Sequence, residues 1–158
     1  MAEWIGHLKG MKFLYFIHLS SVILWFGSAA TDIILELTLW KAKSAEAQKA
    51  YVLLHAKIDL FLELPAMLCA VFSGALLLWS SGYWDIAVWP QWLGWKVLCG
   101  LIAAISNLFC VIFVIIRARL QRSGDLHKVA RWNDAILFSV VGVPFGILAL
   151  WFSLSRFF

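Results

Sequence analysis

A histidine and two acidic residues lie inside a long apolar stretch near the start of the chain. Residues 13–39 read FLYFIHLSSVILWFGSAATDIILELTL, which is long enough to cross a bilayer, yet they include His18, Asp32 and Glu36. Ionisable side chains are costly in such a segment and mark a functional site by default. Together with Trp25 they fall close to one stripe of a helix, because steps of seven and four residues return to nearly the same side. The spacing predicts one chemically active face on a membrane-spanning helix.

The composition restricts the class of protein. The chain has 158 residues, of which 63% are hydrophobic and 14% are charged, and its mean hydropathy is +0.88. A water-soluble domain carries more charge than this, so the composition indicates a polytopic protein that contacts the lipid bilayer. The net charge of +4 comes with no basic face or nucleic-acid motif, so we expect no nucleic-acid partner. The sequence holds no nucleophile elbow, P-loop, HExxH or cysteine metal motif.

The apolar runs predict an all-α fold, a single four-helix transmembrane bundle over residues 1–158. Helix is the only state open to these runs, because lipid cannot satisfy an exposed backbone. We expect a polar, helix-prone connection after the first span and a basic loop, residues 117–131, after the third. Pro144 is expected to kink the fourth span. The expected spans cover residues 13–39, 58–79, 93–116 and 134–152.

The distribution of lysine and arginine predicts the orientation. Basic residues gather in the connections that lie on the cytoplasmic side of a membrane. The connections after the first and third spans hold most of them, so both termini are expected on the opposite side. The residues concerned are Lys41, Lys43, Lys49, Lys57, Arg117, Arg119, Arg122, Lys128 and Arg131.

Depth in the membrane separates the polar residues into two groups. At about 1.5 Å per residue, His18 lies roughly 8 Å inside the outer boundary, and Lys96 enters the third span at a similar depth. Asp32 lies about 21 Å further along the first helix, near the cytoplasmic side. We call His18 and Lys96 the outer cluster. The inner cluster comprises Asp32, Glu36, His55, Asp59 and Glu63.

Two interpretations of the outer cluster are open. In one, His18 bonds a backbone carbonyl, Lys96 extends to the headgroups and Trp25 is a packing residue. In the other, His18 is an axial ligand to a haem iron, Lys96 meets a propionate or an anionic substrate, and Trp25 stacks on the flat cofactor.

The inner cluster is also open to more than one interpretation. Its carboxylates could form ion pairs at the cytoplasmic boundary, with Asp32 and Glu36 meeting Lys57 or Arg131. Alternatively it is a proton or substrate path, or a metal site, since facing helices of a bundle hold metals with carboxylates and histidines. The metal site would be built from His55, Asp59 and Glu63 with Asp32 and Glu36.

Four short motifs resemble a family of small bacterial membrane proteins. His18 is followed after six residues by Trp25-Phe26-Gly27, and residues 65–74 read PAMLCAVFSG. Residues 92–96 read WLGWK, and residues 131–134 read RWND. In this order they resemble the HemJ-type protoporphyrinogen oxidases and, more broadly, the CopD-like and related integral membrane proteins.

The resemblance implies a haem b-binding oxidoreductase or electron-transfer protein of the bacterial inner membrane, and in that membrane the distribution of basic residues predicts both termini on the periplasmic side. It would act on a quinone- or porphyrin-like partner, with His18 on the haem iron and Lys96 in a functional role. Asp32, Glu36 and His55 depart from the family pattern, so a different substrate is expected, with Asp32 and Glu36 beside Lys96 as catalytic candidates.

The alternative function is a proton-coupled transporter or metal-handling protein that uses the inner cluster. A third function is that of a subunit packed in a larger complex, or in a homo-oligomer, with its polar groups joining helices.

Overall fold

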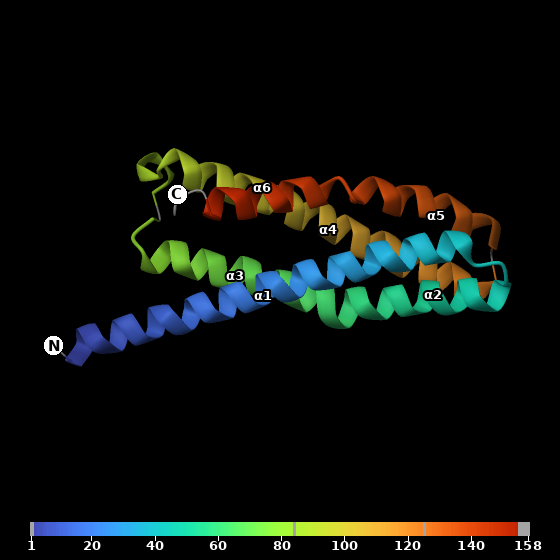
Figure 1. Ribbon diagram of the computed structural model, residues 1–158, viewed down its shortest axis with the longest axis horizontal. Coiled ribbons are helices and arrows are strands. Elements are labelled where there is room, and N and C mark those ends of the chain that lie inside the picture. Colours follow the sequence, from blue (N-terminus) through green and yellow to red (C-terminus); the bar gives the residue numbers. More distant parts are fainter. Residues whose placement is uncertain (1, 84, 125, 155–158) are drawn as a thin grey trace.

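The computed structural model describes residues 2–83, 85–124 and 126–154, and they form an all-α protein. Figure 1 shows its elements running nearly parallel or antiparallel along one long axis. They are α1 (Ala2–Lys41), α2 (Ala45–Ile58), η1 (Asp59–Glu63), α3 (Leu64–Ser80), η2 (Ile86–Val88), α4 (Gln91–Ser123), α5 (Leu126–Ser139) and α6 (Gly142–Leu154).

In the described part of the chain, four helical stretches are long and apolar enough to cross a membrane, which confirms the predicted fold class. They run over Gly10–Lys41, Ala45–Ser80, Gln91–Ser123 and Arg131–Leu154. Each is longer than the sequence predicted, because the polar residues that flank the apolar runs continue the helices instead of ending them. The chain is therefore a multi-pass membrane protein with four candidate spans.

The second span is a continuous helix with one widened turn. Ser44 caps the start of α2 by accepting a hydrogen bond from the Ala47 amide. Further along, η1 is a π-helical turn that ends two residues before Pro65. Proline lacks the amide hydrogen of a regular helix and its ring crowds the carbonyl four residues earlier, and a π-turn at this point relieves both problems. Asp59 and Glu63, at the two ends of this turn, are both buried.

The chain leaves α4 and enters α6 at positions that the sequence explains. Gly124, at φ 79°, ends α4 in the left-handed conformation and its amide bonds the Leu120 carbonyl, as glycine commonly does at a helix end. The fourth span breaks between α5 and α6, and Pro144 falls in the first turn of α6, where a missing amide hydrogen costs no helical bond. The predicted kink at Pro144 is thus a break in the helix just before it.

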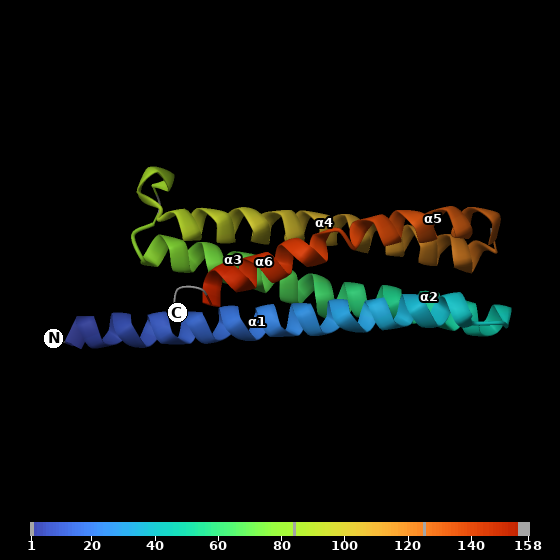
Figure 2. The ribbon, with the colours of Figure 1, turned by 45° about the horizontal axis from the view of Figure 1, so that its top comes forward.

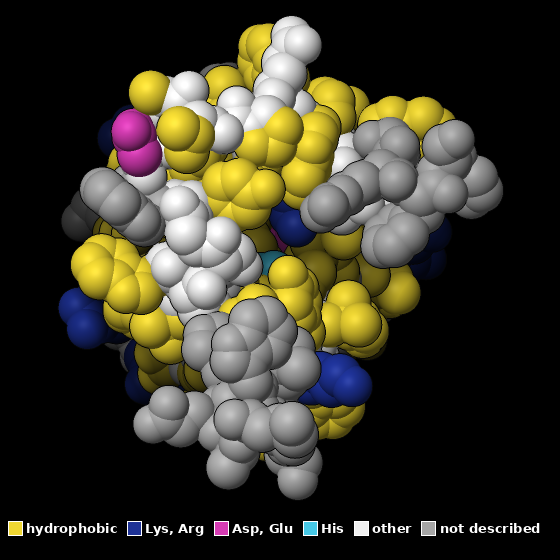
Figure 3. Space-filling view, turned by 90° about the vertical axis from the view of Figure 1, so that its left-hand side faces the viewer, with side chains coloured by type: hydrophobic (Ala, Val, Ile, Leu, Met, Phe, Trp, Pro, Cys, Tyr) yellow, Lys and Arg dark blue, Asp and Glu magenta, His cyan; other side chains and the backbone are white. Residues whose placement is uncertain are grey.

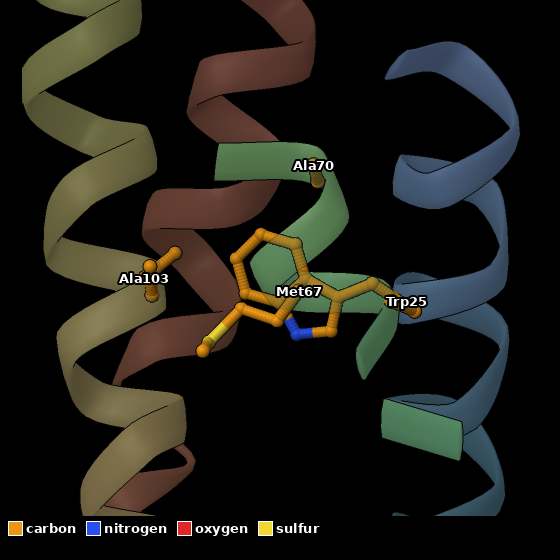
Figure 4. Close-up of a cluster of buried hydrophobic side chains, with 6 residues drawn as sticks. Trp25, Met67, Ala70 and Ala103 are labelled. Carbon is orange, nitrogen blue, oxygen red and sulfur yellow. The ribbon is translucent and has the colours of Figure 1, made fainter. Parts of the chain in front are cut away.

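The helices pack as two layers. Figures 1 and 2 show α1 beside α3 and α2, and α4 beside α5 and α6. A small apolar core joins the layers in the middle of the bundle, and in Figure 4 the side chains of Trp25 and Met67 extend between α1 and α4, beside Ala103. Alanines at this core allow the backbones to approach closely. The core comprises Trp25, Ala66, Met67, Ala70, Ala103 and Ala104.

Candidate functional site

The half of the bundle that contains α2 and α5 holds a buried polar network to which five elements contribute. It contains the whole inner cluster, from α1, α2 and η1, and adds two residues of α4 and one of α5. We call it the inner network. Its members are Asp32, Glu36, His55, Asp59, Glu63, Asn107, Arg117 and Asn133.

Arg117 is the positive centre of this network. Its side chain is 0% exposed, and its guanidinium holds both carboxylate oxygens of Glu36. The bond from Nη1 to Oε2 of Glu36 measures 3.0 Å, and the same nitrogen donates to Oδ1 of Asn133 at 3.0 Å. A planar guanidinium matches a carboxylate in this two-point geometry, which makes the pair strong and directional.

His55 connects this ion pair to the remaining carboxylates. Its Nδ1 lies 2.7 Å from Oε1 of Glu36 and 3.0 Å from Nη2 of Arg117. Its Nε2, on the other side of the ring, lies 3.2 Å from Oδ1 of Asp59 and 3.7 Å from Oδ1 of Asp32. The imidazole therefore has an ion pair on one side and two carboxyl groups on the other.

The network has more acceptors than donors. It contains four carboxyl groups and one guanidinium, all inside the membrane-spanning segments. Both oxygens of Asp32 and both of Asp59 are buried without a hydrogen-bond partner, as is Nε2 of His55. The carboxyl groups of Asp32, Asp59 and Glu63 also lie close enough to act on one another electrostatically. Buried carboxylates of this kind are costly unless a proton or a cation lies between them.

Glu63 has a partner of its own. The side-chain amide of Asn107 donates to Oε1 of Glu63, across the interface between η1 and α4. This bond leaves Oδ1 of Asn107 buried without a partner. Glu63 is therefore held in place at the edge of the unsatisfied carboxyl groups.

Asp32, His55 and Asp59 together could bind a metal ion. One ligand atom from each lies within 4.8 Å of the others, and we call these residues the Asp–His–Asp group. In a tetrahedral site the ligand atoms are about 2.0–2.2 Å from the ion, which places them about 3.3–3.6 Å apart. The two distances from His55 are already close to this range, so a small inward movement of the carboxylates would complete the geometry. Of the metal ligands predicted from the sequence, Glu36 binds Arg117 and Glu63 binds Asn107 instead.

A cavity of about 280 Å³ lies next to the inner network, between α1 and the α5–α6 pair. Asp32, Glu36, His55 and Glu63 are at its polar end, whereas most of its wall is apolar. Phe26 and Gly146 both line it and are in such close contact that a Cβ on the glycine would lie 2.6 Å from the phenylalanine ring.

The outer cluster is built differently. Nδ1 of His18 lies 3.0 Å from the Ala70 carbonyl and 3.1 Å from the Ser73 hydroxyl, and Gly74 leaves room for the ring. Lys96 is half-buried and close enough to act electrostatically on His18, but no hydrogen bond joins them in the described structure. Figure 3 looks onto this end of the bundle, where hydrophobic side chains surround a hollow and basic, acidic and histidine side chains are visible at its bottom.

Trp25 separates the two clusters. It is 9% exposed and belongs to the apolar core, in agreement with its interpretation as a packing residue. The same side chain also lines the cavity. Lys96, Asp32 and Glu36, which we considered together as catalytic candidates, therefore lie on two sides of an apolar layer.

Two expectations about the partners of the carboxylates were wrong. Lys57 and Arg131 are exposed, and the basic partner of Glu36 is Arg117. The sequence placed Arg117 in a basic loop, but α4 continues to Ser123 and carries it into the interior. Asn107 and Asn133 were missed as well. No signal in the sequence identifies Arg117, because its position directly after the apolar run of α4 does not show whether the helix stops or continues.

Comparisons of the chain with protein-family models, with curated proteins and with solved structures find no match. The support for a functional role of the buried Asp–His–Asp group is therefore its geometry alone.

Proposed function

We propose that this is a metal-handling membrane protein that binds a divalent transition-metal ion at Asp32, His55 and Asp59. The observation that carries the proposal is the set of buried ligand atoms in this group that make no hydrogen bond. A divalent cation at this point would compensate both carboxylates and accept the free lone pair of the imidazole.

The surroundings of His55 favour its interpretation as a metal ligand over its interpretation as a member of a simple ion pair. A histidine that binds a metal usually donates its other ring N–H to a carboxylate, which fixes its tautomer and its orientation. Glu36 is in the position to accept such a bond from Nδ1, and Arg117 in turn holds Glu36. With Nδ1 as donor, Nε2 directs a lone pair toward the carboxyl groups of Asp32 and Asp59.

The donor set narrows the choice of metal. Two carboxylates and an imidazole suit Zn²⁺, Mn²⁺, Fe²⁺ or Co²⁺, whereas Mg²⁺ and Ca²⁺ prefer oxygen ligands alone. Three protein ligands leave coordination positions open, as they do in catalytic sites and sites of exchange. By the distribution of basic residues, the site lies in the cytoplasmic half of a bacterial inner membrane, with both termini periplasmic.

Metal binding to the purified protein tests the proposal. The protein in lipid nanodiscs is stripped with a chelator and titrated with Zn²⁺ and with Mn²⁺ in a calorimeter. We expect one ion per chain, and a loss of affinity of about 100-fold in Asp59→Asn, because this change replaces a charged carboxylate ligand by a neutral amide. Glu46→Gln, which alters an exposed carboxylate at the start of α2, is the matched control. Equal binding by the two variants would overturn the proposal.

Movement of the metal distinguishes a carrier from a fixed site. Proteoliposomes that contain the protein and an entrapped metal-sensitive dye should show uptake that Asp59→Asn abolishes. Stoichiometric binding without uptake would assign the metal to a resident role.

A second candidate function, a haem-dependent oxidoreductase, is supported by the outer cluster. A carbonyl can only accept, so the bond to Ala70 places the proton of a neutral His18 on Nδ1 and leaves Nε2 with a lone pair. Haem-binding histidines have this arrangement. Lys96 would meet a propionate there. An absorption spectrum of protein produced with ample haem tests it: a Soret band that His18→Ala removes is expected, and a colourless wild-type protein would contradict it.

A further inference from the structure

The cavity beside the inner network has the features of a ligand site of its own. Its polar end presents carboxyl groups, and its described lining residues include no lysine or arginine. Aromatic rings supply part of the wall, from Trp25, Phe26 and Trp40. A site with several acidic and aromatic groups, and with His55 as its one basic lining residue among those described, is complementary to positive charge.

One carboxylate at this site lacks any hydrogen-bond partner. Asp32 is only 7% exposed and lines the cavity, and neither of its oxygens makes a hydrogen bond; Nε2 of His55 lies 3.7 Å from one of them. Glu63 lines the same cavity, with Asn107 bonded to one of its oxygens. Negative charge buried in this way stabilises a cation that enters the cavity more strongly than a carboxylate in water would.

The cavity is partly open, and it opens toward the lipid. Large apolar side chains of its lining are exposed on the outer surface of the membrane-spanning segments: Ile33 and Leu37 on α1, and Leu137 and Ile147 on the facing helices. A ligand that enters the cavity through this side comes from the bilayer and passes along apolar side chains before it reaches the carboxyl groups. Small hydrated ions do not take such a route, because hydrocarbon cannot replace their water.

We propose that this cavity binds a lipophilic organic monocation that enters from the bilayer. Its charge lies against Asp32 and Glu63, and its apolar groups lie against the aromatic and aliphatic wall. An anion of equal size is repelled by the carboxylates, and a neutral molecule leaves them without compensation.

This site and the proposed metal site share Asp32 and His55 but can be tested separately. Asp59 belongs to the Asp–His–Asp group and does not line the cavity, whereas Glu63 lines the cavity and does not belong to that group. The organic-cation site therefore does not depend on the metal proposal.

Tetraphenylphosphonium and tetraphenylborate are a suitable pair of probes, because they share shape and hydrophobicity and differ in the sign of the charge. Equilibrium dialysis against wild-type protein in nanodiscs, with a chelator present and empty nanodiscs as the blank, measures specific binding. We expect saturable binding of tetraphenylphosphonium and none of tetraphenylborate. Glu63→Gln should weaken the phosphonium about tenfold, because it removes one buried charge and leaves an amide that Asn107 can still meet.

Two variants serve as controls. Asp59→Asn should weaken phosphonium binding less than Glu63→Gln does, since its carboxylate is outside the cavity and further from the bound charge. Glu46→Gln should have no effect, because this side chain is exposed on α2. Equal binding of the two probes, or an unchanged affinity in Glu63→Gln, would overturn the proposal.

A second measurement does not require any change to the acidic residues. Cys110 lines the cavity, whereas Cys99 is buried and does not line it. In a Cys69→Ser background, which removes the exposed thiol, N-ethylmaleimide should label Cys110, and tetraphenylphosphonium should slow the labelling at least about fivefold at saturation. Labelling that tetraphenylborate slows equally, or that neither probe slows, would contradict a charge-selective site.

Discussion

His18 in the outer cluster and His55 in the inner cluster lie in the same membrane bundle, but the partners of their imidazole rings differ. His18 has a carbonyl and a hydroxyl within hydrogen-bonding distance of one nitrogen and packs against a glycine. His55 has an arginine–glutamate pair on one nitrogen and, facing the other, two carboxyl groups that make no hydrogen bond. Neutral partners satisfy the first histidine, whereas the second lies in a network that has an excess of negative charge.

This difference separates polar groups that join helices from polar groups that require a ligand. A hydrogen bond to a backbone carbonyl lets an imidazole hold α1 against α3 at little electrostatic cost. Carboxyl groups that face one another inside a bundle lower the stability of the empty protein unless something compensates them. We therefore expect substitutions in the inner network to have larger effects, and some of them to have the opposite sign.

The largest effect on the free energy of unfolding is expected at Arg117. Arg117→Met removes the fully buried guanidinium and leaves Glu36 without its partner, so it should cost about 3–5 kcal/mol of unfolding free energy. Unfolding in mixed micelles, followed by tryptophan fluorescence, measures the loss. Arg119→Met, an exposed position in the same helix, is the control and should change stability by less than about 0.5 kcal/mol. Similar losses in the two variants would show that the network does not depend on this ion pair.

Asp59 tests the excess of negative charge directly. Asp59→Asn keeps the shape of the side chain and removes one of three buried carboxyl groups that act on one another. This relief outweighs the lost charge beside His55, so the metal-free protein should become more stable by about 1–2 kcal/mol. The gain should disappear or reverse when Zn²⁺ is added, because only the wild type is stabilised by the bound ion. If the variant is less stable without metal, Asp59 is a structural partner of His55 and the comparison between the two clusters fails.

The sequence predicted the inner cluster much better than its partners. His55, Asp59 and Glu63 recur every four residues, and this spacing was sufficient to place them on one face with the acidic residues of α1. Arg117 was missed because a charge at the end of an apolar run looks the same whether the helix stops or continues. Asn107 and Asn133 carry no charge that would distinguish them within their helices.

Other features depended on contacts between distant parts of the chain. The bond from His18 to Ala70 joins residues on different helices, and no local pattern specifies it. The cavity also depends on distant contacts, since its walls come from α1, α2, η1, α4, α5 and α6 and exist only when these elements are assembled. The four spans, in contrast, follow from local apolar length, which is why the fold class was predicted correctly.

A substitution at Gly74, which lies against the ring of His18, tests how firmly this histidine is held. A Cβ at this position would lie 3.1 Å from Cε1 of His18, and the ring is tethered by its bonds to α3 and cannot easily move away. Gly74→Ala should therefore cost about 1 kcal/mol in the same unfolding assay. Gly27→Ala, where nothing lies within 4 Å, should be neutral or slightly stabilising, because alanine favours helix. Equal behaviour of the two variants would mean that His18 is free to move.

The smallest effect is expected at Ser73. Its hydroxyl lies 3.1 Å from Nδ1 of His18, but that nitrogen keeps the Ala70 carbonyl when the hydroxyl is removed. Ser73→Ala should thus cost only about 0.5 kcal/mol, because no buried group loses its last partner. Metal titration of this variant should match the wild type, since the apolar core around Trp25 lies between Ser73 and the inner network. A weakened metal site in Ser73→Ala would show that the two clusters are coupled across that core, and the membrane-embedded polar groups would then have to be treated as one path.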